Sequence, residues 1–149
     1  MLAAVRPHAW DFPLFLHVLG AMVLVGAVAT AALLAIVAWR RPGMPVYARA
    51  AFWTLLAVGV PAYVVMRVGA QWTYSKEGFS GKNDPTWIGI GFMAADAGLL
   101  LLLVATGLAF WWRRQGKPVA GRIVAGLASV YLVLLAVAWF AMSAKWGSG

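Results

Sequence analysis

The segment Tyr63-Val-Val-Met-Arg67-Val-Gly-Ala-Gln71-Trp-Thr-Tyr74 places polar groups inside a long apolar run. Tyr63, Arg67 and Gln71 recur every fourth residue, and Tyr74 follows Arg67 by seven, so on a helix all four side chains form one polar stripe. An arginine within a membrane is energetically costly unless another group pairs with it. Asp96 is the other charged residue deep inside an apolar run. The sequence therefore predicts that Arg67 and Asp96 meet and define a polar pocket.

The composition of the chain is that of an integral membrane protein. Its 149 residues suffice for one domain, and hydrophobic residues make up 64% of them against 11% charged. Several apolar runs reach the length of about 18–20 residues that crosses a bilayer. We expect four transmembrane helices, over residues 13–39, 46–74, 85–112 and 119–143. Because the connections are short, the predicted fold is a single all-α domain, an antiparallel bundle of four transmembrane helices.

The distribution of basic residues predicts the orientation in the membrane. Seven basic residues and no acid flank one end of the predicted helices: Arg40, Arg41, Arg49, Arg113, Arg114, Lys117 and Arg122. The other end has four basic residues, Arg6, Lys76, Lys82 and Lys145, beside three acids. The first end is then cytoplasmic, and both termini lie outside a bacterial inner (plasma) membrane. Topology accounts for the net charge of +8, so we expect the lipid bilayer and no nucleic acid as a partner.

Three polar residues from three predicted helices fall at a similar depth. The rise of 1.5 Å per residue gives the distance of each residue from the outer end of its helix. This distance is about 9 Å for His17, about 10 Å for Arg67 and about 14 Å for Asp96. His17 also shares a helix face with small residues such as Gly20, along which membrane helices approach closely. The predicted pocket therefore lies in the outer half of the bundle.

Two interpretations of these residues remain open. Arg67 and Asp96 form either a structural ion pair or a site for an anionic group such as a propionate, with hydrogen bonds from Gln71, Tyr63 and Tyr74. His17 is either a core histidine or an axial ligand to haem iron, since imidazole is a common haem ligand and four-helix bundles house haem. The other histidine of the chain is His8.

The segment Phe15-Leu-His17-Val-Leu-Gly20-Ala-Met-Val-Leu-Val-Gly26 resembles the first helix of a group of small bacterial four-helix membrane proteins. The group includes the HemJ-type protoporphyrinogen oxidases and the CopD-like copper-resistance domains. The resemblance implies that His17 occupies the position of a histidine that binds haem b. The chain departs from the HemJ pattern in lacking a lysine and further histidines on the later helices, and Asp96 stands where a basic residue is expected.

These observations favour a haem- or porphyrin-binding redox protein of the membrane, with His17 as axial ligand and Arg67 and Gln71 holding a propionate. One alternative is a non-enzymatic small subunit or scaffold of a larger membrane complex, with a membrane-protein partner or a second copy of the chain. A further alternative is a small transporter component. The sequence carries no HExxH, GxSxG or phosphate-loop motif, so whether the chain is an enzyme stays open.

Overall fold

The computed structural model describes residues 11–41, 43–79, 81 and 84–144. His8, Arg6, Lys82 and Lys145 lie outside these ranges. The described residues form α1 (Asp11–Arg40), α2 (Pro45–Trp53), the π-helical segment η2 (Thr54–Gly59), α3 (Val60–Lys76), α4 (Thr86–Gln115) and α5 (Pro118–Ser143). Since α2, η2 and α3 are continuous, these elements make four helical stretches that are long and apolar enough to cross a membrane. The predictions of an all-helical fold and of four membrane-length helices are confirmed.

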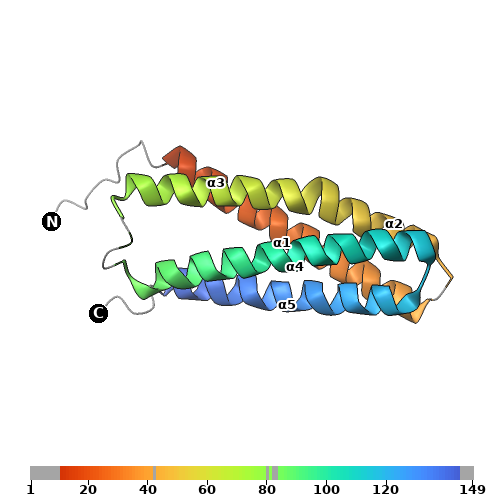
Figure 1. The fold of residues 1–149 in the computed structure, drawn as a ribbon. Coiled ribbons are helices and arrows are strands. Elements are labelled where there is room, and N and C mark those ends of the chain that lie inside the picture. The colour runs from red at the N-terminus through yellow and green to blue at the C-terminus, as the bar shows by residue number, and fades with distance from the viewer. Residues whose placement is uncertain (1–10, 42, 80, 82–83, 145–149) are drawn as a thin grey trace.

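The two ends of the molecule differ in charge. The end of α1, the start of α2 and the turn at 116–117 lie together at one end, which we call the basic end because it carries the seven basic residues named above (Figure 1). The start of α1, the end of α5 and the described residues between α3 and α4 lie at the opposite end, the loop end (Figure 1). Helix α1 packs against α3 and α5, and α5 packs against α4, whereas α3 and α4 approach each other closely at few positions.

Small side chains form much of the helix interfaces. Ala31 and Ala35 of α1, Ala51 of α2 and Ala109 of α4 are fully buried, and larger side chains such as Leu24 fill the remaining core. Many large apolar side chains point outward, where they are 60–75% exposed: Met22, Leu33, Leu100, Val133 and Trp139. A surface of this kind is stable against hydrocarbon and unfavourable in water.

Segment η2 changes the helical hydrogen-bond pattern just before Pro61. In an α-helix the N–H of residue 61 would bond to the carbonyl of Ala57, but proline has no N–H. In the structure the N–H of Val60 donates instead to the carbonyl of Leu55, five residues back. The π-helical turn therefore joins α2 to α3 without interrupting the helix.

Candidate functional site

Arg67 and Asp96 form an ion pair between α3 and α4. The Nη2 atom of Arg67 lies 3.2 Å from Oδ1 of Asp96, and the guanidinium also lies 4.7 Å from the centroid of the Phe92 ring. The predicted meeting of Arg67 and Asp96 is thus confirmed. The Asp96 side chain is 68% exposed and that of Arg67 is 31% exposed, so the pair lies at the surface between α3 and α4 and not in a closed interior pocket.

Tyr63 makes a second polar link between the same two helices. Its hydroxyl donates to the carbonyl of Ala95, the residue before Asp96, at 3.2 Å. Unlike the ion pair, Tyr63 is only 5% exposed. Side chains thus bridge α3 and α4 over a region in which the two backbones stay apart.

Tyr74 ties the end of α3 to the connection that follows it. Its hydroxyl donates to Oδ2 of Asp84 at 2.5 Å, and the backbone N–H of Gly81 donates to the same oxygen at 3.1 Å. The Tyr74 ring packs edge-on against Phe92, with 5.3 Å between centroids. The sequence predicted Tyr74 as a hydrogen-bonding group of the pocket; the structure instead gives its hydroxyl to Asp84.

Gln71, the remaining member of the polar stripe, has an exposed side chain. Its backbone carbonyl accepts a hydrogen bond from the hydroxyl of Ser75 at 2.9 Å. The structure therefore places Tyr63, Arg67 and Asp96 in one cluster between α3 and α4, while Gln71 lies one helical turn further toward the loop end.

His17 on α1 bonds to the backbone of α3. Its Nδ1 atom lies 3.1 Å from the carbonyl oxygen of Met66, the residue before Arg67. A carbonyl oxygen can only accept, so Nδ1 carries a proton, and the tautomer of the imidazole that fits this bond has its lone pair at Nε2. His17 faces the neighbouring helix, as its position on the small-residue face predicted.

Two glycines explain how the imidazole reaches that carbonyl. A Cβ added to Gly20 would lie 2.8 Å from Cα of Met66, and one added to Gly69 would lie 2.8 Å from Cα of His17. The backbones of α1 and α3 are therefore in direct contact here. Gly20 belongs to the small-residue face that the sequence predicts for α1, whereas Gly69 was not predicted as a contact. Gly69 follows Met66 by three residues, just as Gly20 follows His17 by three. This equal spacing is the feature of the sequence that could have indicated the contact.

No family model, curated protein or solved structure matches this chain.

The donor groups of the site suit some cofactors better than others. Within the described ranges no three His, Cys, Asp or Glu side chains gather where they could hold a metal ion. A haem requires only one protein ligand to its iron. A histidine whose Nδ1–H is held by a backbone carbonyl has the arrangement typical of metal-ligating histidines, and the described residues include no partner for its Nε2. The residues present are thus compatible with haem at His17.

Proposed function

We propose that this integral membrane protein binds a tetrapyrrole, haem b, in the half of the bundle near the loop end. The hydrogen bond from His17 Nδ1 to the Met66 carbonyl is the observation that supports this most, because it fixes the tautomer that offers Nε2 to iron. Bound haem would supply one-electron redox chemistry. The protein itself would orient the imidazole and bind the carboxylates of the cofactor.

Arg67 is the residue that suits a propionate. A guanidinium has five N–H donors, and a single Nη2–Oδ1 contact with Asp96 leaves others available. The side chain of Arg67 is also partly exposed, so a ligand can reach it. Asp96 would then hold the guanidinium in place, and Tyr63 would keep α4 at its distance from α3.

The same proposal includes an orientation. The four helical stretches would cross the membrane as antiparallel spans, with the basic end in the cytoplasm and both termini outside. The excess of lysine and arginine at the basic end supports this orientation.

Absorption spectroscopy of the detergent-extracted protein tests tetrapyrrole binding. We expect a Soret band in the wild type, purified directly or after haem loading, and its loss in His17→Ala. His8→Ala is the matched control, because His8 is the other histidine of the chain, and this variant should keep the band. Arg67→Gln should retain less haem with an unchanged band position. A wild type without a Soret band after loading would rule the proposal out.

A second candidate function is that of a small subunit of a larger membrane complex. An ion pair whose carboxylate side chain is 68% exposed is unfavourable beside lipid, and a partner helix could cover it. Several helical glycines also have open space where a Cβ would be, namely Gly26, Gly89, Gly107 and Gly126. Extraction from the membrane in native lipid discs tests this function. A particle with the mass of one chain would argue against it.

A further inference from the structure

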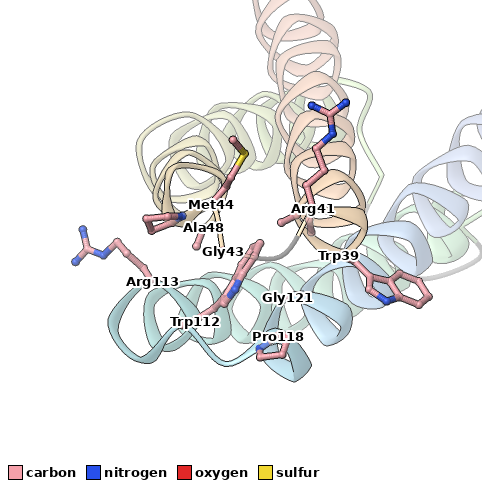
Figure 2. A pocket seen from close by; sticks show the side chains of 13 residues that line it. Trp39, Arg41, Gly43, Met44, Ala48, Trp112, Arg113, Pro118 and Gly121 are labelled. Atoms are coloured by element: carbon pink, nitrogen blue, oxygen red, sulfur yellow. The ribbon is translucent and has the colours of Figure 1, made fainter.

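A cavity of about 280 Å³ lies at the basic end, where α1 and α4 finish and α2 and α5 begin. Its walls are apolar and include Ala35, Ala48 and Trp112, which are at most 6% exposed. Arg41 and Arg113 also line it, and Figure 2 shows their guanidinium groups on opposite sides, both directed away from its centre. The cavity therefore combines an apolar interior with a cationic rim.

A second hollow of about 380 Å³ is lined by Pro45, Arg49, Arg113 and Arg114. Arg113 and Pro45 line both spaces, so the two adjoin. Arg113 is held by aromatic rings: its guanidinium lies 4.5 Å from the centroid of Phe52 and 5.2 Å from that of Phe110. Stacking of this kind positions the charge without neutralising it.

No acidic side chain of the protein compensates these arginines. The four acids of the chain are Asp11, Glu77, Asp84 and Asp96, and all of them belong to the loop half. Helices α2 and α5 start at this cavity and α1 and α4 end there, so the partial charges of the four helix ends offset one another and the arginines determine the positive field. The counter-charge must come from outside the chain.

We propose that the cavity and its arginine rim bind an anionic phospholipid, with the phosphate diester at the rim and the glycerol and first methylene groups inside. The charge of the rim is complementary to the phosphate, and basic pockets between helix ends are suited to acidic head groups. A soluble phosphate compound would satisfy the rim but would leave the apolar walls without a partner. This site lies at the opposite end of the bundle from His17 and does not depend on tetrapyrrole binding.

Native mass spectrometry of the full-length protein, titrated with phosphatidylglycerol or phosphatidylcholine, tests the proposal. We expect tighter binding of phosphatidylglycerol. Arg113→Gln should weaken it about fivefold, which corresponds to about 1 kcal/mol for one surface cation. Ala38→Leu, which fills the cavity from a half-buried position and leaves every charge in place, should also weaken it. The matched control is Arg40→Gln, which removes a charge at the same end from a residue that lines neither hollow.

Three outcomes would overturn the proposal. Equal affinity for the two lipids would show that charge does not select the ligand. Equal losses in Arg113→Gln and Arg40→Gln, with no effect of Ala38→Leu, would show a general electrostatic attraction without a site. Displacement of phosphatidylglycerol by millimolar inorganic phosphate would identify a soluble phosphate compound as the occupant.

Discussion

Gly20 on α1 and Gly69 on α3 occupy equivalent positions in a reciprocal contact. Gly20 lies against the backbone of Met66, three residues before Gly69, and Gly69 lies against the backbone of His17, three residues before Gly20. In each case the atoms that a Cβ would meet belong to the backbone, which cannot move aside as a flexible side chain can. Without a hydrophobic driving force between helices in lipid, such close packing is a main source of helix association.

Gly20→Ala and Gly69→Ala should therefore each destabilise the protein. Added volume in a packed interface costs about 1–3 kcal/mol. Gly26→Ala is the control, since a Cβ at Gly26 meets nothing within 4 Å, and its stability should be unchanged or slightly higher. Thermal unfolding in detergent provides the measurement. Equal stability of all three variants would contradict the assignment of a backbone contact.

The ion pair between Arg67 and Asp96 should show energetic coupling. Arg67→Gln or Asp96→Asn alone leaves one charge unpaired, so each single change should lower stability by about 1–2 kcal/mol, between the values for exposed and for buried pairs. The double variant should be less destabilised than the sum of the two. A double-mutant cycle in detergent or in lipid discs measures this difference. Strict additivity would mean that the 3.2 Å contact contributes nothing.

Two buried tyrosines should respond in opposite ways to removal of the hydroxyl. The hydroxyl of Tyr131 is buried and, within the described part of the chain, has no hydrogen-bond partner. Tyr131→Phe should therefore raise stability by about 1 kcal/mol, because a desolvated polar group is removed. Tyr63→Phe loses a bond to the Ala95 carbonyl and should lower stability by about 1 kcal/mol. Chemical or thermal unfolding of both variants measures the two changes in stability. Changes of the same sign would contradict the prediction.

The proposed orientation can be tested by thiol labelling, because the chain has no cysteine. Ser75 lies at the loop end and Gln115 at the basic end, and both side chains are exposed. In spheroplasts, whose plasma membrane is intact and whose outer membrane has been removed, a membrane-impermeant maleimide should label Ser75→Cys and should not label Gln115→Cys. After the membrane is permeabilised both should react. The opposite pattern in intact spheroplasts would place the basic end outside.

The sequence was sufficient for the helices and for one contact of the site. Apolar runs of membrane length have few alternatives to helix, because backbone polar groups in lipid must bond within the segment. An arginine and an aspartate inside such runs need partners, so Arg67 and Asp96 could be paired from charge alone. Haem binding by His17 stays a prediction.

Other features depend on tertiary relations that local sequence does not encode. The exposure of Asp96 results from how far apart α3 and α4 lie, which depends on how α1 and α5 pack. The bond from Tyr74 to Asp84 depends on the path of the connecting segment. A glycine such as Gly69 suits either a lipid-facing position or a helix contact, and only the neighbouring helix distinguishes the two.

The π-helical turn at Thr54–Gly59 has a consequence for the direction in which the polar stripe points. Such a turn amounts to one extra residue in a helix, and each residue advances an α-helix by about 100°. Winding the same residues as an ordinary α-helix would rotate everything beyond the turn, Arg67 included, by about that angle away from α4, whereas deleting one residue from the turn would restore ordinary winding and leave that direction nearly unchanged. The direction of the second half of this helix, and with it the contact of Arg67 with Asp96, thus depends on the π-helical winding of a turn far from either charge.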